Sequence, residues 1–422
     1  MSRLGRWVWV VGGGLIVWAT LLPGNEIASQ QIPPRWCLMC GGLWMTDALS
    51  NVALFAPLGI ALALRGWRWW IVGAAALGLS VGVETLQSRG FPPARSAALA
   101  AVITNSLGGL LGAGLVARWD WVVAPSVVVA RRLTVAWAAG ASAVFGFTTL
   151  AVGPRDARVG AAASSAADLS ASPYPHIPGQ PWSGGILDSA IVGGTYRVRR
   201  GSSEPAIVQI GRDVPMLDAE AFVHGRATEP STVPIVFVHA PSDSAPVLQL
   251  RSHGDAAELA VTRRAWAWGL ALPPARLADA FRGRTPDDAR PLHLVAHVGR
   301  DSLVLSARGP GYEGRAVLAL APTLGWAMIQ TVVEPSSALA PIVLCCWLAG
   351  LVLPIGWWGA RSGGGSRWIT LAAAGAVAIV LRFLPPITGV APVSRPQWMA
   401  LAVLLAAGAV GSRLLHRGRV PI

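Results

Sequence analysis

Six polar side chains that could do chemistry interrupt an otherwise apolar stretch between residues 47 and 112. They are Asp47, Asn51, Glu84, Gln87, Arg95 and Asn105. The carboxylates could act as a general acid or base, the guanidinium could hold an anionic group, and the amides could donate and accept hydrogen bonds. Inside hydrocarbon such groups are tolerated only where they face one another or water. We therefore expect them to form one buried polar cluster.

The spacing of these residues places them in pairs on predicted helices. Asp47 and Asn51 are four residues apart, and Glu84 and Gln87 are three apart, so each pair shares one helix face. Asn105 follows the arginine by ten residues, which is roughly 15 Å of helix rise and places it inside the bilayer, in need of a partner. A packing role is the plain alternative to a functional one for each of these side chains.

Glycines follow the last of these polar residues. Gly108 and Gly112 form a G-x-x-x-G sequence, which lets a neighbouring helix approach closely. We expect these two glycines to serve helix packing.

The composition is that of a membrane protein. Hydrophobic residues make up 53% and charged residues 13% of the 422-residue chain, whereas soluble domains carry about a quarter charged residues. Between Gly153 and Glu334, 17 Arg balance 17 Asp and Glu, so the excess of Arg elsewhere accounts for the whole net charge of +13. A nucleic-acid-binding protein would carry its basic charge on a soluble domain, so the charge distribution argues against a nucleic-acid partner.

Apolar segments predict about eight transmembrane helices. They cover about residues 7–22, 48–64, 69–85, 97–116, 133–152, 339–358, 368–381 and 398–411. The first could be a secretory signal, but no A-x-A-like cleavage site follows it, so we interpret it as an uncleaved helix. The chain is thus predicted to have five helices in residues 1–152 and three in residues 337–422.

The middle of the chain, residues 153–336, contains no segment of spanning length. Short alternating or β-branched segments separated by turn residues predict an antiparallel β-sandwich there. The segments are 206–210, 221–225, 233–240, 246–252, 258–262, 266–272, 292–298, 302–308 and 316–320, with one short helix at 273–283.

Two residue pairs in this β domain could bind a ligand. His293 and His297 share one strand face, and Trp266 and Trp268 share another. The histidines could bind a metal and the tryptophans a sugar ring. A solvated face and core packing are the plainer interpretations, so we predict no metal site and no cofactor.

Arginines orient the predicted spans. Placing both termini in the cytoplasm puts twelve arginines inside and four outside, as the positive-inside rule requires. Those inside are Arg3, Arg6, Arg65, Arg68, Arg118, Arg131, Arg132, Arg361, Arg367, Arg413, Arg417 and Arg419, and those outside are Arg35, Arg89, Arg95 and Arg395. We therefore predict a multi-pass protein of the cell membrane with residues 153–336 outside the cytoplasm.

The four cysteines occur in two pairs. Cys37 and Cys40 lie in a predicted outer loop, where an oxidising compartment permits a disulfide; free thiols are the alternative. No third and fourth ligands lie near them, so they do not predict a zinc site. Cys345 and Cys346 lie inside an apolar helix and are interpreted as small hydrophobic side chains.

The polar segments resemble the VanZ-like family of small membrane proteins. The matching sequence covers about residues 7–150 and consists of TLLP at the end of the first span, CLMC, D-x-x-x-N-x-x-x-F-x-P-x-G (Asp47, Asn51, Phe55, Pro57, Gly59), E-x-x-Q (Glu84, Gln87), and Arg95 followed after ten residues by N-x-x-G-x-x-x-G. The resemblance implies a cell-envelope role, with some members linked to resistance to glycopeptides such as teicoplanin. The family usually has an acid where this chain has Ala101, so a mechanism that needs that carboxylate would be impaired unless Glu84 and Asp47 suffice.

Residues 180–334 are similar to laminin-G-like or concanavalin-like jelly-roll domains, through the sequence ARPLHLVAHVGRDSLVLSARGPG. This resemblance implies binding of carbohydrate or protein, and some such domains hold calcium.

Three functions follow from these patterns. The first is a cell-envelope protein whose helical unit engages a lipid or cell-wall precursor while the β-sandwich binds a glycan or protein. The alternative is an intramembrane enzyme acting on a lipid-linked substrate, with Glu84 or Asp47 as acid or base and Arg95 holding an anionic group. The sequence contains no nucleophile elbow, P-loop or zinc motif, which favours the first. A transporter is the third, but no internal helical repeat supports it.

Overall fold

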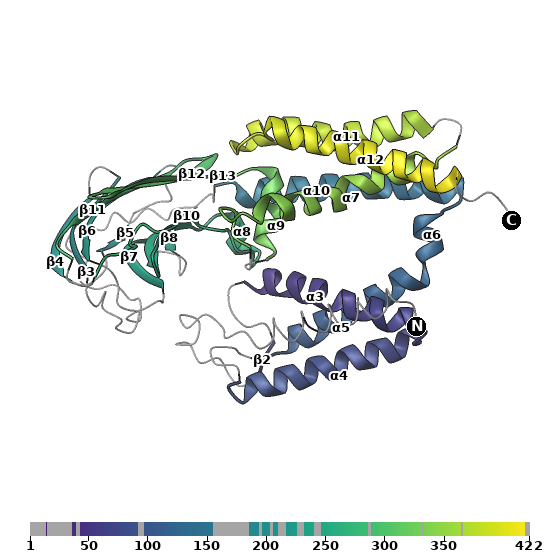
Figure 1. Ribbon diagram of the computed structural model, residues 1–422, viewed down its shortest axis with the longest axis horizontal. Coiled ribbons are helices and arrows are strands. Elements are labelled where there is room, and N and C mark those ends of the chain that lie inside the picture. Colours follow the sequence, from purple (N-terminus) through teal and green to yellow (C-terminus); the bar gives the residue numbers. More distant parts are fainter. Residues whose placement is uncertain are drawn as a thin grey trace.

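The computed structural model describes residues 14, 36–38, 43–91, 97–154, 185–193, 196–202, 206–209, 217–225, 232–239, 246–285, 288–330, 333–363 and 366–417. Long helices extend from one side of a β domain in two groups, one below the other in Figure 1. The first group is built from the N-terminal part of the chain, and the second combines α7 with the C-terminal helices.

The first group contains three helices: α3 (Trp44–Leu64), α4 (Trp69–Ser88) and α5 (Leu99–Ala117). We call these the three-helix unit. Helix α5 packs against both α3 and α4. Ahead of α5, β2 (Ala97–Ala98) pairs in parallel with β1 (Trp36–Cys37). The beginning of α3, the end of α4 and the beginning of α5 all lie at the end of the unit that faces the β domain (Figure 1).

The second group consists of α7 (Val127–Val152), α10 (Ala340–Gly359), α11 (Ser366–Thr388) and α12 (Arg395–Arg417). Its core contains Phe145, Leu348 and Leu381. The short helix α6 (Trp119–Val123) links the two groups at the end far from the β domain. It is held there because the indoles of Trp357 and Trp358 donate hydrogen bonds to carbonyls of α6.

Seven of the described helices are long and apolar enough to cross a membrane. The predicted span at about 7–22 lies outside the described residues. Helix α3 begins four residues before its predicted start, α7 begins six residues earlier, and α11 ends seven residues later. The predicted ends were wrong because they stopped at charged or proline residues. Arg131 and Arg132 lie in the second turn of α7, and Pro385 and Pro386 lie inside the last turns of α11.

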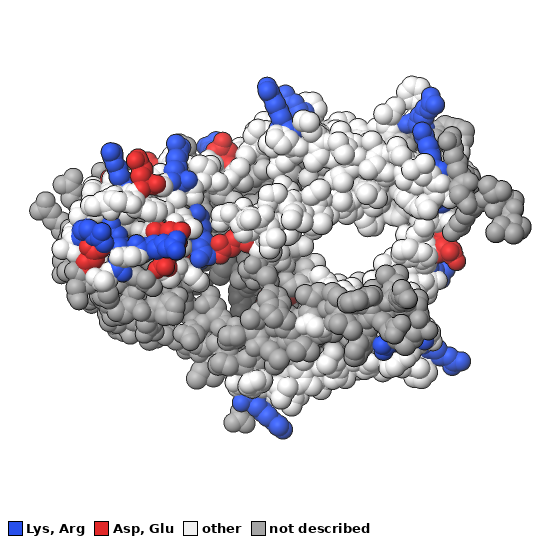
Figure 2. All heavy atoms as spheres, in the orientation of Figure 1, with Lys and Arg blue, Asp and Glu red and all other residues white. Residues whose placement is uncertain are grey.

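The charged side chains are distributed as expected for helices that cross a membrane. Figure 2 shows them over the β domain and at the ends of the helices, with an uncharged band between. Tryptophans at the end of the helices far from the β domain, including Trp69 and Trp368, are exposed. Tryptophans of this kind are typical of the membrane–water interface.

The β domain contains two sheets. One has the strand order β10-β9-β8-β7-β5 and the other β13-β12-β11-β6-β3-β4. The bounds are β3 Gly185–Val192, β4 Tyr196–Ser202, β5 Ala206–Gln209, β6 Leu217–Gly225, β7 Thr232–His239, β8 Pro246–His253, β9 Ala256–Val261, β10 Ala275–Leu277, β11 Pro291–Val298, β12 Ser302–Gly309 and β13 Tyr312–Ala319. The pairing is antiparallel except between β5 and β7. Both sheets contribute to one core, with Leu248 and Leu250 from the first and Leu292 and Leu294 from the second.

Two local predictions in this domain were wrong. Residues 273–283 form strand β10 followed by turns rather than a helix, because Ala275 and Leu277 are buried with Arg276 between them, which is the pattern of a strand. Residues 266–272 are no strand. The short helix α8 (Arg264–Ala267) leads instead into a turn at Gly269, whose φ is 65°. Strands β3 and β4 were not predicted.

Glycines set the distance between α3 and α5. A Cβ at Gly108 would lie 2.5 Å from the carbonyl oxygen of Val52, and one at Gly112 would lie 2.1 Å from that of Ala56. The two backbones therefore touch where the G-x-x-x-G sequence crosses α3. This close approach is the arrangement that a packing role of the two glycines requires.

We expect Gly112→Ala to destabilise the three-helix unit, because the added methyl group would overlap the Ala56 carbonyl and force α3 and α5 apart. The matched control is Gly114→Ala on the same helix, where a Cβ meets nothing within 4 Å. Thermal unfolding in detergent should show a lower melting temperature for the first variant only. Equal melting temperatures would contradict the close helix contact.

Candidate functional site

The three-helix unit is fixed to the β domain at the start of α3. The N–H groups of Met45 and Thr46 both donate to the Gly269 carbonyl, at 3.1 and 3.0 Å. The first N–H groups of a helix have no acceptor within the helix, so an external acceptor is needed when that end is covered. Here the β domain supplies it.

Side chains of α3 extend this junction. The Thr46 hydroxyl donates to the Met328 carbonyl at 2.7 Å and accepts from the Ala271 N–H at 3.0 Å. One turn later, the Ser50 hydroxyl donates to the Ile329 carbonyl at 2.6 Å. These contacts fix both the position and the rotation of α3 at the β domain.

Gly269 is required at this junction for two reasons. Its backbone is in the left-handed region, and a Cβ there would lie 2.5 Å from the Trp44 ring.

The β domain also contains a buried arginine. The side chain of Arg263 donates to the Gly299 carbonyl, and burial lowers the pKa of Arg263 to about 10. Arg263 is still charged at neutral pH.

Glu84 is the most buried carboxylate of the predicted cluster. Only 3% of the residue is exposed, and its Oε2 accepts the N–H of Ala98 at 2.7 Å. Ala98 is the N-cap position of α5, where a negative charge interacts favourably with the helix dipole. Glu84 therefore joins the end of α4 to the start of α5.

Asn105 lies deeper in the same unit. It is 4% exposed, and its Nδ2 donates to the Ser80 hydroxyl at 2.8 Å. Its Oδ1 is buried and has no hydrogen-bond partner among the described residues. On the α3 side, Asn51 Nδ2 lies 3.5 Å from the hydroxyl of Thr104.

These groups form two levels. Asn105 is seven residues beyond Ala98 on α5, which is roughly 10 Å of helix rise. We call the set of Glu84, Ser80, Asn105, Thr104 and Asn51 the polar ladder. It extends from the end of the unit that faces the β domain into its interior, and it includes one amide oxygen with unused acceptor capacity.

The structure brings some of the predicted residues together and leaves others apart. Gln87 is buried near Glu84, as expected for residues that share a face. The Asp47 side chain is exposed in the first turn of α3, so it is not part of the buried set. Arg95 lies outside the described residues, and so does Cys40. The predicted disulfide between Cys37 and Cys40 stays a prediction.

Sequence analysis missed Ser80 and Thr104. The signal for Ser80 was available, because Val72, Ala76, Ser80 and Glu84 recur at four-residue spacing and are all buried on α4. A serine in that row faces the same neighbours as Glu84. The sequence offers no comparable signal for Thr104.

The side chains of the polar ladder are hydrogen-bonding groups. Among the described residues, no three His, Cys, Asp or Glu side chains are grouped closely enough to hold a metal ion. The ladder contains one buried carboxylate, two side-chain amides and two hydroxyls, and the Oδ1 of Asn105 has no partner among the described residues. This set suits a ligand that donates hydrogen bonds.

The candidate residues of the β domain are arranged differently. His293 and His297 share the outer face of β11, as predicted, and His297 Nδ1 lies 2.5 Å from Asp218 Oδ1. Trp266 and Trp268 do not share a strand face. Trp268 packs against Phe147 of α7, with 4.7 Å between ring centroids.

Comparison with known proteins identifies one part of the chain. The family model described as VanZ/LLP1 matches residues 10–120. No curated protein and no solved structure matches the chain. The matched range contains every residue of the polar ladder and ends before α7. Residues 10–120 of the chain therefore match the VanZ/LLP1 family.

Proposed function

We propose that this protein is a multi-pass cell-envelope protein whose VanZ domain holds a lipid or cell-wall precursor at the polar ladder. Such a role is linked, in our proposal, to resistance against teicoplanin-type glycopeptides. The observation that carries the proposal is the buried Oδ1 of Asn105, which has no hydrogen-bond partner among the described residues.

An unsatisfied buried acceptor has a cost. Leaving one buried polar atom without a partner costs about 1–3 kcal/mol. The Ser80 hydroxyl satisfies the amide nitrogen of Asn105 but not its oxygen. A hydroxyl or amide donor of a bound ligand would satisfy the oxygen and remove that cost.

The surface beside the ladder favours an amphipathic ligand. Helix α5 exposes a row of large apolar side chains at four-residue spacing, away from its buried face. They are Leu99, Ile103, Leu107, Leu111 and Leu115. A molecule with acyl or isoprenoid chains can contact this row, and in this proposal its polar group reaches Asn105 at the deeper level of the ladder.

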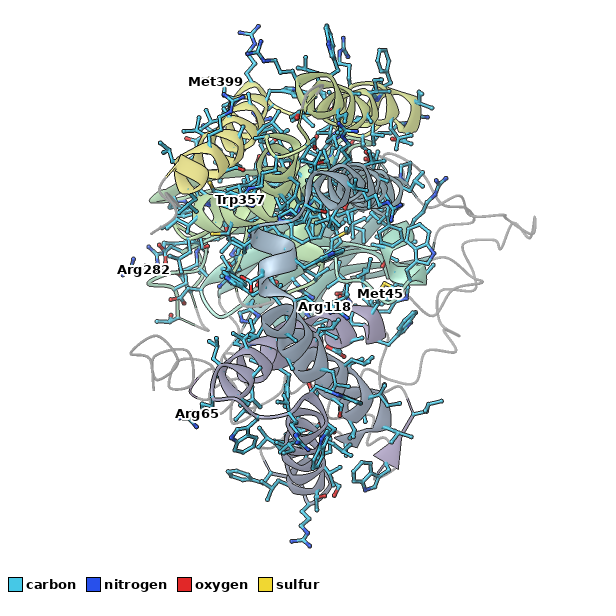
Figure 3. All side chains as sticks on the ribbon, turned by 90° about the vertical axis from the view of Figure 1, so that its right-hand side faces the viewer. Met45, Arg65, Arg118, Arg282, Trp357 and Met399 are labelled. Atoms are coloured by element: carbon cyan, nitrogen blue, oxygen red, sulfur yellow. The ribbon has the colours of Figure 1, made fainter. Side chains whose placement is uncertain are left out.

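The proposed orientation places the β domain outside the cytoplasm and both termini inside. Arginines gather at the ends of the helices far from the β domain, and Figure 3, which looks onto that end, labels Arg65 and Arg118. An excess of arginine in short loops is typical of the cytoplasmic side. The end of the polar ladder at Glu84 then lies on the side of the outer leaflet, where wall precursors are used.

This orientation is testable with single cysteines in a background without the native ones. We expect Arg282→Cys, in the β domain, to react with a membrane-impermeant maleimide in intact cells, because its side chain is 73% exposed. Trp368→Cys, at the start of α11 and far from the β domain, should react only after the membrane is permeabilised. The reverse labelling pattern would overturn the topology.

The alternative function is an intramembrane enzyme acting on a lipid-linked substrate. The observation that favours it is the burial of the Glu84 carboxylate, since charged groups inside a membrane are costly and often functional. In this version Glu84 or Asp47 serves as acid or base and Arg95 holds an anionic group. The two functions differ in whether a proton must move.

Three variants in cells that otherwise lack the protein separate these functions. If ligand binding is the function, Asn105→Ala should abolish the glycopeptide phenotype, while Glu84→Gln keeps most of it because an amide oxygen can still accept the Ala98 N–H. Ser80→Ala is the matched control: it removes the partner of the Asn105 nitrogen but leaves Oδ1 in place. The minimal inhibitory concentration of teicoplanin at equal protein levels is the measurement.

Two results would contradict the proposal. Equal effects of Ser80→Ala and Asn105→Ala would mean that the pair serves packing only. Complete loss with Glu84→Gln and normal protein levels would favour the enzyme instead.

A further inference from the structure

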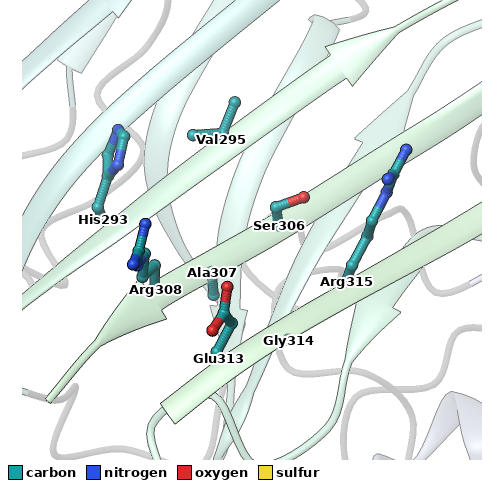
Figure 4. Close-up of a pocket in the computed structure, with 8 residues that line it drawn as sticks. All are labelled: His293, Val295, Ser306, Ala307, Arg308, Glu313, Gly314 and Arg315. Atoms are coloured by element: carbon teal, nitrogen blue, oxygen red, sulfur yellow. The ribbon is translucent and has the colours of Figure 1, made fainter.

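The outer face of the six-stranded sheet carries a pocket of about 370 Å³. This volume is near the lower end of the range for small-ligand sites. Two cross-strand rows of β11, β12 and β13 line it (Figure 4). The first row is His293, Arg308 and Glu313, and the second is Val295, Ser306 and Arg315.

The charged residues of this pocket have no ion-pair partner among the described residues. Arg308 and Glu313 are directly opposite one another on β12 and β13, where opposite charges usually interact. Nevertheless, Arg308, Glu313 and Arg315 form no ion pair within the described part of the chain. By contrast, Arg290 on the same domain forms a close pair with Asp288. The pocket thus presents two guanidinium groups and one carboxylate with their hydrogen-bonding capacity unused.

The imidazole of His293 borders the pocket in a fixed orientation. The ring of Phe222 stacks on it, with 4.1 Å between centroids and 5° between planes. The Nε2 atom is 3.4 Å from Glu220 Oε2 without making a hydrogen bond. Since Phe222 covers one face of the imidazole, the other face is left to the pocket.

We propose that this pocket binds an acidic saccharide. Guanidinium groups match carboxylate and phosphate oxygens in bidentate geometry, so Arg308 and Arg315 would hold the anionic group. Glu313 would accept hydrogen bonds from sugar hydroxyls, and Ser306 could both donate and accept them. A simple inorganic anion would gain nothing from Glu313, which is why a hydroxylated ligand fits better.

The distance of the pocket from the membrane favours a polymeric glycan over a lipid headgroup. Strand β12 begins near the helices, where the Ala391 N–H donates to the Leu320 carbonyl and the Leu320 N–H donates to Asp301. Arg308 is six residues further along β12 than Ser302, which is roughly 20 Å of extended chain. The pocket therefore lies at the distal part of the β domain.

This inference rests on the proposed function only for the location of the β domain in the envelope. It concerns a different site, so the binding measurement can succeed or fail independently of the glycopeptide phenotype.

The experiment is calorimetric titration of the full chain in nanodiscs of phosphatidylcholine, at one fixed ionic strength. The probes are a trimer of galacturonic acid, glucose 1-phosphate and a neutral galactose trimer. We expect at least one acidic probe to bind and the neutral trimer not to bind. The two acidic probes distinguish a carboxylate from a phosphate as the recognised group.

Variants test whether the pocket is responsible. Arg308→Gln and Arg315→Gln should each weaken binding by about tenfold, since each removes a charge-assisted contact. Arg282→Gln is the control of equal charge change, on an exposed arginine of the same domain that pairs with Asp279. Melting temperatures establish that the variants are folded.

Glu313→Gln distinguishes saccharide recognition from simple attraction of anions. If Glu313 accepts sugar hydroxyls, the substitution weakens binding although it removes a negative charge. Tighter binding by this variant would overturn the proposal. So would equal affinities of Arg308→Gln, Arg315→Gln and Arg282→Gln, or no binding of either acidic probe by the unchanged protein.

Discussion

Hydrocarbon cannot form hydrogen bonds, so every polar group of the three-helix unit must find its partner within the protein or in a ligand. The start of α3 meets this constraint through the Gly269 carbonyl, the N-cap of α5 through Glu84, and the nitrogen of Asn105 through Ser80. The Oδ1 of Asn105 is the exception among the ladder residues. That open acceptor is the observation on which the proposed ligand rests.

Close packing makes the ladder rigid. Because the backbones of α3 and α5 touch at Gly108 and Gly112, the polar residues of these helices cannot shift relative to one another without breaking that contact. The junction at Thr46 and Ser50 holds α3 to the β domain in the same way. One connected framework therefore carries the polar ladder and the outer sheet pocket, which differ in their chemistry.

Sequence reasoning predicted the helices and the G-x-x-x-G contact because apolar length and glycine spacing are local signals. It also placed Glu84 and Asn105 in the interior. It could not find the acceptor for α3, because Gly269 is far away in sequence and lies in a segment whose alternating tryptophans imitate a strand. It also predicted that Asp47 is buried in the polar cluster, whereas this residue is exposed. Sharing a helix face with Asn51 does not determine whether a residue at the helix end is buried. Thr104 was missed because a threonine within an apolar helix usually bonds its own backbone, as this one also does.

The central claim is that the polar ladder holds a ligand, and photo-crosslinking in membranes tests it most directly. A photoreactive amino acid at Ala101, one turn above Asn105 on the same face of α5, would lie beside the ladder. The same amino acid at the lipid-facing Leu111, which is 61% exposed, reports on bulk lipid. The account predicts that position 101 captures a lipid-linked or wall-related molecule that position 111 does not, and that Asn105→Ala abolishes this product. Capture of the same bulk phospholipids at both positions would contradict it.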